Sequence, residues 1–237
     1  MSDFTKAFER LVNIMLELRE KCPWDKKQTN ESLRYLTIEE CYELSDAIMS
    51  KNSIDIKEEL GDLILHVIFY SVIASEKKQF TLNDVLNSQS EKLIHRHPHI
   101  YSDVKVKNEK EVKKNWELLK LKEKSKSSIL SGVPKSLPTM LKSYRVLEKV
   151  KGIGFDFINN DDAFDKVVEV INEFKKEFRQ NNLERASEEF GDILFSLIGY
   201  GQKIGINAVN SLEKTNQKFI KRFNEMENLI SKDKKNI

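Results

Sequence analysis

One segment of this chain occurs twice, and this repetition constrains the fold more than any other feature of the sequence. The segment EELGDLILHVIFY begins at Glu58 and recurs as EEFGDILFSLIGY at Glu188, 130 residues further on. When a four-residue deletion is allowed, EKLIHRH at Glu91 also matches QKFIKRF at Gln217. The sequence therefore predicts a tandem duplication of one structural unit.

The length of the chain and a linker-like segment near its middle indicate two such units. The 237 residues suit two domains, each of roughly 100 to 120 residues and able to bury its own core. The stretch KEKSKSSILSGVPKSLP, rich in Ser and Lys, separates the copies and is typical of a linker. We expect an N-terminal domain over residues 1–124, a linker over 125–137 and a C-terminal domain over 138–237.

Composition and periodicity predict an all-α fold. Charged residues make up 33% of the chain and hydrophobic residues 39%, with only 8 Gly and 4 Pro, too few turn-forming residues for an all-β protein. Apolar residues recur at three- and four-residue spacings, which indicates amphipathic helices before the linker. The expected ranges are 4–20, 31–51, 54–77, 81–96 and 108–124. The second and third of these are joined by a short connection, so we expect an antiparallel pair.

Several classes of partner are not favoured by the composition. The formal net charge is only +2, and the Lys-rich stretch 105–126 is interleaved with Glu, so we expect no nucleic-acid partner. The most apolar run, Leu63 to Ala74, is shorter than the roughly 18 residues that a membrane-spanning helix needs. Two cysteines and an N-terminus without an apolar signal core favour the cytoplasm and no membrane partner.

Two pairs of acids lie on the neighbouring predicted helices of the first copy. EECYE places Glu40 and Glu43 three residues apart, and EELGD does the same for Glu59 and Asp62. Each pair shares one face of its helix, and antiparallel packing would bring the two pairs together. One such motif is common on solvated helices, but four carboxylates in a half-buried site require a cation. Oxygen ligands favour Mg²⁺, with Mn²⁺ as a possible substitute.

Four motifs carry a resemblance to a known family. CPWDKKQT, TIEECYELSDAI, EELGDLILHVIFY and KLIHRHPHIY are similar to motifs of the MazG family, and the resemblance covers nearly the whole chain in two copies. It implies an all-α nucleoside triphosphate pyrophosphohydrolase, usually a tight dimer, in which water attacks the α-phosphorus and pyrophosphate leaves. It also implies that magnesium is held by Glu40, Glu43, Glu59 and Asp62.

The resemblance extends to residues that would contact the nucleotide. Lys92 and Arg96 lie four residues apart on one helix face and would bring positive charge to the triphosphate. Surface ion pairing is the alternative role for these two. Trp24 and Trp116 are candidates for stacking on the base, although core packing is the more common role of a Trp.

The acids that precede the expected ligands are candidates for handling the attacking water. Glu39 and Glu58 would orient or deprotonate it. His66 lies on the same helix face as Glu59, but Ser196 replaces it in the second copy. We therefore expect a local polar contact from His66. His97 and His99 flank Pro98, where we expect a loop, and their spacing alone is weak evidence for a metal site.

The second copy departs from this pattern at one position. Val170 stands where the first copy has Glu40, and no counterpart of Trp116 follows later in the chain. We therefore expect a degraded second site and an active first copy. The remaining matched residues of the second copy are Glu173, Glu189, Asp192, Lys218 and Arg222.

Two alternative interpretations of the acidic pattern remain. A di-iron carboxylate protein expects Glu-x-x-His on two helices, whereas Glu43 and Asp62 occupy those positions here. A non-catalytic helical scaffold, or a nucleotide-binding regulatory protein, is the stronger rival. We also expect a homodimer, because each copy has few helices to cover its apolar segment, residues 63–74 or 193–200. The preferred base and sugar of the substrate are not predicted.

Overall fold

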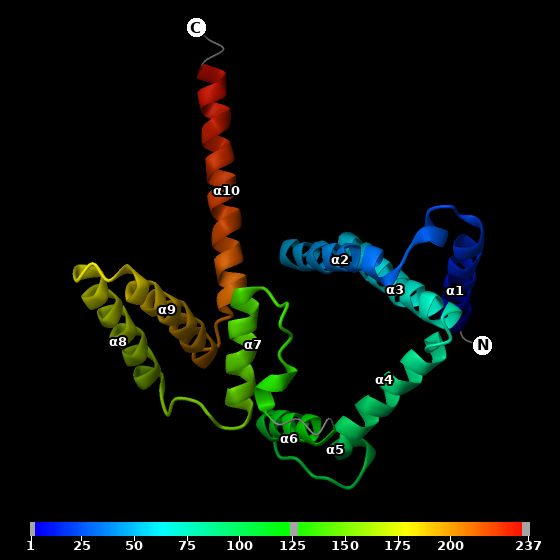
Figure 1. The fold of residues 1–237 in the computed structure, drawn as a ribbon, viewed down its shortest axis with the longest axis horizontal. Coiled ribbons are helices and arrows are strands. Elements are labelled where there is room, and N and C mark those ends of the chain that lie inside the picture. The colour runs from blue at the N-terminus through cyan, green and yellow to red at the C-terminus, as the bar shows by residue number, and fades with distance from the viewer. Residues whose placement is uncertain (1–2, 124–127, 234–237) are drawn as a thin grey trace. The chain divides into compact units, whose positions relative to one another are not determined.

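The protein is all-helical, as the sequence predicts. The computed structural model describes residues 3–123 and 128–233, and no β-strand occurs in these two ranges. The chain forms two compact units, Met1–His95 and Arg96–Ile237 (Figure 1). Residues 125–127 of the predicted linker lie outside the described residues. The predicted domain boundaries remain a prediction.

The helices of the first unit follow the predicted ranges to within about two residues. Its connection before α4 is a reciprocal cap, which the sequence also predicts. The backbone N–H of Thr81 donates to Asp84 Oδ2 at 2.8 Å, and the N–H of Asp84 donates to Thr81 Oγ1 at 3.2 Å. The elements are α1 (Asp3–Lys21), the 3-10 turn η1 (Asp25–Lys27), α2 (Asn30–Ser50), α3 (Ser53–Glu76) and α4 (Leu82–Arg96).

A two-residue connection turns α2 back on α3. Lys51 adopts the left-handed conformation, with φ 57°, and Asn52 caps α3 by accepting a hydrogen bond from the backbone of Ile54 at 3.1 Å. The second copy uses the same device 130 residues later, with Asn181 at φ 53° and Asn182 as the cap. The duplication is therefore a duplication of backbone geometry as well as of sequence.

Helix α1 covers one side of this hairpin and completes the core of the first unit. Met15 from α1, Leu33 from α2, and Ile68, Phe69 and Ile73 from α3 form one buried apolar cluster. Burial of such side chains contributes about 1.5 to 3 kcal/mol each to folding. This core fixes α2 and α3 side by side.

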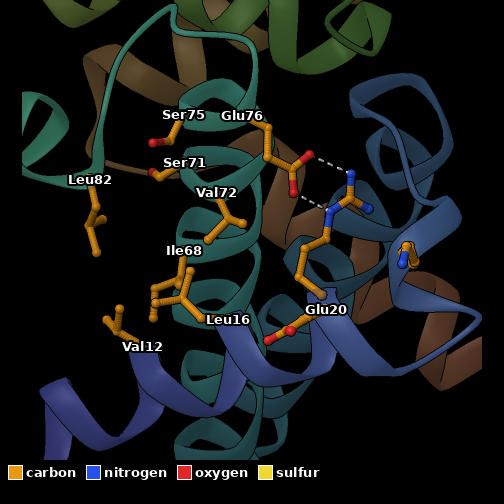
Figure 2. A pocket seen from close by; sticks show the side chains of 11 residues that line it. Val12, Leu16, Glu20, Ile68, Ser71, Val72, Ser75, Glu76 and Leu82 are labelled. Carbon is orange, nitrogen blue, oxygen red and sulfur yellow. Dashed lines mark hydrogen bonds and ion pairs between the residues drawn. The ribbon is translucent and has the colours of Figure 1, made fainter.

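Arg19 fastens the loop between α1 and α2 to the end of α3. Its guanidinium donates to both carboxylate oxygens of Glu76, at 2.8 and 2.9 Å, and Figure 2 marks these two bonds at Glu76 with dashed lines. It also donates to the backbone oxygens of Asp25 and Gln28. A hollow of about 740 Å³ lies beside this ion pair, and none of the four predicted metal ligands lines it. The Trp24 loop is therefore held at the end of the hairpin where α3 finishes.

The second unit repeats the hairpin as α8 and α9 and adds further helices. One short helix, α5, was not predicted. We expected a loop around Pro98 and His99, but Pro98 begins a helical turn, because a proline is favourable at the first position of a helix. The elements are α5 (Pro98–Tyr101), α6 (Glu109–Glu123), η2 (Ile129–Gly132), α7 (Thr139–Gly152), α8 (Asn160–Arg179), α9 (Leu183–Lys203) and α10 (Ala208–Asp233). Within the described ranges, no helix combines the length and apolar character required to cross a membrane.

Candidate metal and nucleotide site

Three of the four predicted metal ligands meet between α2 and α3. Single carboxylate oxygens of Glu40, Glu43 and Glu59 lie within 4.8 Å of one another. Asp62 is close enough to act on the pKa of both Glu40 and Glu59. Elsewhere in the described ranges, no three His, Cys, Asp or Glu side chains approach in this way. The antiparallel hairpin thus gathers the two acidic pairs as the sequence predicts.

The electrostatics of this carboxylate cluster are unfavourable without positive charge. The pKa of Glu40 is raised to about 7, first by burial and then by the negative charges of Asp62, Glu43 and Glu59. The pKa of Glu59 is also raised, first by burial and then by Glu43, Asp62 and Glu58. A cluster that repels its own charge takes up either protons or a cation.

The arrangement fits a divalent cation. Oε2 of Glu59 is a buried oxygen with no hydrogen-bond partner in the described part of the chain. A buried polar atom without a partner is costly, and a bound cation is one way of satisfying it. All the donors are carboxylate oxygens, which suit Mg²⁺ or Mn²⁺. The residues present therefore match the predicted kind of ion.

A partly buried polar network lies beside the carboxylate cluster. Oγ1 of Thr37 on α2 is 2.7 Å from Nδ1 of His66 and 2.7 Å from the hydroxyl of Tyr70, both on α3. Burial lowers the pKa of His66, although the charge of Asp62 opposes this effect. The local polar contact expected of His66 is confirmed. Sequence reasoning missed Thr37, and its Thr-x-x-Glu spacing to Glu40 was the available signal.

The two acids proposed to handle water differ in their relation to the carboxylate cluster. Glu39 and Glu58 are both exposed. Glu58 contributes to the raised pKa of Glu59, so its charge reaches the carboxylate cluster. The charge of Glu39 does not contribute to the raised pKa of Glu40 or of Glu59.

The predicted cationic and aromatic residues occupy several places. Lys92 is exposed on α4 in the first unit. In the second unit the guanidinium of Arg96 stacks over the ring of Trp116, 5.6 Å from its centroid. His97 meets the same ring edge to face at 4.8 Å. This stacked group was not predicted, because it depends on the turn that α5 introduces between the two segments.

Trp24 is not brought to the carboxylate cluster within the first unit. Its ring is 56% exposed on the loop that Arg19 ties to Glu76. Glu76 lies 17 residues beyond Glu59 on α3, a separation of roughly 25 Å along a helix axis. The Trp24 loop and the carboxylate cluster are at different ends of the hairpin.

The second hairpin holds its acids differently. Val170, at the position of Glu40, is only 2% exposed and packs in the core of that hairpin. Glu189 is half-buried, and burial raises its pKa, with Glu173 and Asp192 adding to the shift. Lys166 lies one turn before Val170, and its Nζ is 2.9 Å from an oxygen of Glu169. The matched cationic residues Lys218 and Arg222 are exposed on α10.

Lys166 also lies within the electrostatic reach of the remaining acids. Its hydrogen bond to Glu169 raises its pKa most, and the charges of Glu173 and Asp192 raise it further. Leu36 occupies the matched position of the first copy. Sequence reasoning missed this lysine because it compared only the candidate site residues between the copies, and Leu36 was not among them.

Comparison with known proteins agrees with the motifs. The MazG nucleotide pyrophosphohydrolase domain matches residues 28–101, which contain the whole carboxylate cluster. A Thermotoga maritima protein named nucleoside triphosphate pyrophosphohydrolase/pyrophosphatase MazG is 41% identical over 95% of this chain and 88% of its own length. The chain belongs to the MazG family.

Two other relatives are similar over nearly the whole of this chain. An Escherichia coli K12 protein named nucleoside triphosphate pyrophosphohydrolase is 38% identical over 94% of this chain and 88% of its own length. A Bacillus subtilis protein, YabN, described as uncharacterized, is 41% identical over 93% of this chain but only 46% of its own length. The similarity to MazG proteins therefore spans both copies of the repeat.

The raised pKa of Glu40 predicts how the metal-free protein responds to pH. The folded-state pKa of about 7 exceeds the usual value of 4.5, so the folded state binds more protons between these values. The stability from this group is therefore fully present below pH 4.5 and is lost as pH rises through 7. Glu40→Gln removes the charge, so in chelator at pH 8 it should melt at a higher temperature than the unsubstituted protein.

The control for this measurement is Glu39→Gln, an exposed neighbour on the same helix. It removes one negative charge but leaves the carboxylate cluster intact, so its melting temperature should change little. Equal melting temperatures for Glu40→Gln and the unsubstituted protein at pH 8 would contradict the raised pKa.

Proposed function

We propose that this protein hydrolyses nucleoside triphosphates to the monophosphate and pyrophosphate. The carboxylate cluster of Glu40, Glu43 and Glu59, with Asp62 beside it, is the observation that carries this proposal. Phosphoryl chemistry requires neutralisation of charge and alignment of the reactants more than a covalent partner. In the proposed reaction a water oxygen bonds to the α-phosphorus, and the bond to the bridging oxygen of the β-phosphate breaks.

The proposed roles divide between metal binding and proton transfer. Glu40, Glu43, Glu59 and Asp62 would hold Mg²⁺, or Mn²⁺ in its place, which supplies positive charge to the phosphates. An exposed carboxylate near this cluster can accept a proton from the attacking water. Glu58 suits that role better than Glu39, because its charge already acts on Glu59.

The proposed nucleotide contacts come from the segment after α3. Lys92 and Arg96 would bind the phosphates, and Trp116 would contact the base. The position of Arg96 over Trp116 supports a joint role, because the ring fixes the orientation of the planar guanidinium and of the N–H groups at its edge. A base contact by Trp24 has no support from its position in the first unit.

We also propose that two chains associate as a homodimer. On α3 the side chains of Leu60, Ile64 and Val67 form one exposed apolar stripe, each nearly half accessible. The matched residues Phe190, Leu194 and Leu197 form the same stripe on α9. Apolar stripes of this kind are usually covered by another protein surface.

Light scattering tests the homodimer. The expected mass is about twice the 27.7 kDa of one chain. An active protein with the mass of one chain would contradict this prediction.

The position of bond cleavage is the direct test of the proposed reaction. With a mixed set of nucleoside triphosphates and Mg²⁺, phosphorus NMR should show pyrophosphate and nucleoside monophosphates as the first products. The physical reason is that attack at the α-phosphorus leaves the β and γ phosphates joined. Orthophosphate with a diphosphate as first products would contradict the proposed cleavage site, and no release from any nucleotide would favour a binding or scaffold protein.

The duplication supplies a matched test of which copy is active. Asp62→Asn and Asp192→Asn make the same chemical change at matched positions. We expect Asp62→Asn to lower kcat by at least about tenfold, because it weakens the complete carboxylate cluster. Asp192→Asn should leave kcat within about twofold of the original value. The opposite result would assign the active copy to the second hairpin.

A further inference from the structure

A small polar network crosses the contact between α2 and α3 beside the carboxylate cluster. Thr37 joins His66 and Tyr70 through two contacts of 2.7 Å, and Oγ1 of Thr37 also lies 3.1 Å from the backbone oxygen of Leu33. His66 is only 8% exposed. Buried polar groups of this kind are costly unless they are paired, so their hydrogen bonds hold the two helices in one register.

The position of the network relates it to the acids. Thr37 precedes Glu40 by three residues on α2, and His66 follows Asp62 by four residues on α3. Thr37 and His66 therefore each lie one helical turn from a proposed metal ligand, on the same face of its helix. A slip of either helix would break the Thr37 to His66 contact and separate the carboxylates at the same time.

The proton arrangement gives the network a direction. Tyr70 and Thr37 each carry one hydroxyl proton, and a neutral imidazole carries one N–H. A threonine hydroxyl has one proton, so when Tyr70 donates to Thr37 and Thr37 donates to Nδ1 of His66 rather than to the backbone oxygen of Leu33, the ring proton lies on Nε2. The nearby negative charge of Asp62 favours this arrangement, because a carboxylate attracts an N–H donor.

The second copy provides an internal comparison. Val167 replaces Thr37 and is buried, and Ser196 replaces His66. Tyr200 keeps the position of Tyr70, but its ring packs against Phe164 at 5.3 Å. The network is therefore absent at these matched positions. The same hairpin has Val170 at the position of Glu40.

We propose that His66, held by Thr37 and Tyr70, is a positioning residue that fixes Asp62 and the register of α2 on α3 for divalent-cation binding. This inference rests on the proposed function, because it concerns the same carboxylate cluster. Residues that orient metal ligands typically contribute about 10- to 100-fold to metal affinity. His66 acts through Asp62 and does not itself ligate the ion.

Metal affinity is measured without nucleotide, on the full-length protein. Electron paramagnetic resonance of free Mn²⁺ gives the Kd directly. His66→Ser and Thr37→Val install the residues of the second copy, and each should raise the Mn²⁺ Kd by about tenfold or more. Ser196→Ala, at the matched position of the second hairpin, should leave it unchanged.

Conservative variants separate positioning from folding. Thr37→Ser keeps the hydroxyl, and His66→Gln keeps a group that accepts from Thr37 and donates toward Asp62, so both should restore Mn²⁺ affinity to within about threefold. The proposal is overturned if His66→Ser binds Mn²⁺ normally. It is also overturned if the conservative variants bind as weakly as Thr37→Val and His66→Ser, or if the unsubstituted protein binds no Mn²⁺.

The same measurement distinguishes this inference from the proposed function. Should the unsubstituted protein bind Mn²⁺ but release pyrophosphate from no nucleotide, the proposed reaction fails. The predicted order of Mn²⁺ affinities would still hold in that case, and it would support the positioning role.

Discussion

Repulsion between carboxylates is the interaction on which the rest of the first hairpin depends. Glu40, Glu43 and Glu59 bring oxygens within 4.8 Å of one another, and the pKa of Glu40 rises to about 7 as a result of burial and these neighbours. Charges of one sign separate unless other interactions hold them. The left-handed turn at Lys51 and the core around Met15 provide that restraint at two levels of the hairpin.

Features set by local chemistry were predictable from the sequence. The helix ranges followed from apolar spacing, and the cap at Thr81 followed from the acid three residues later. The meeting of the acidic pairs followed from two simple rules, that a short connection makes helices antiparallel and that residues three apart share a face. These inferences needed no knowledge of contacts between distant segments.

Features set by contacts between distant segments were not predictable. The stacking of Arg96 on Trp116 depends on the short helix α5, where a loop was expected. The contact between Thr37 and His66 depends on the axial register of two helices, which spacing within one helix does not determine. Lys166 was not predicted for a different reason. It occupies the position matched by Leu36 in the first copy, and an apolar residue there gives no sign of a site.

The position of Lys166 has a consequence for how each copy responds to its surroundings. Lys166 is part of the chain, so the positive charge that it brings to Glu173 and Asp192 is present whatever ions the solution contains. Within the described ranges, no cationic side chain acts on the pKa of Glu40 or Glu59, so the positive charge there comes from protons or ions in solution, and its supply varies with their activity. The two hairpins therefore differ in how their acids are neutralised. The first depends on the ionic composition of the solvent, whereas the second carries part of its counter-charge on Lys166.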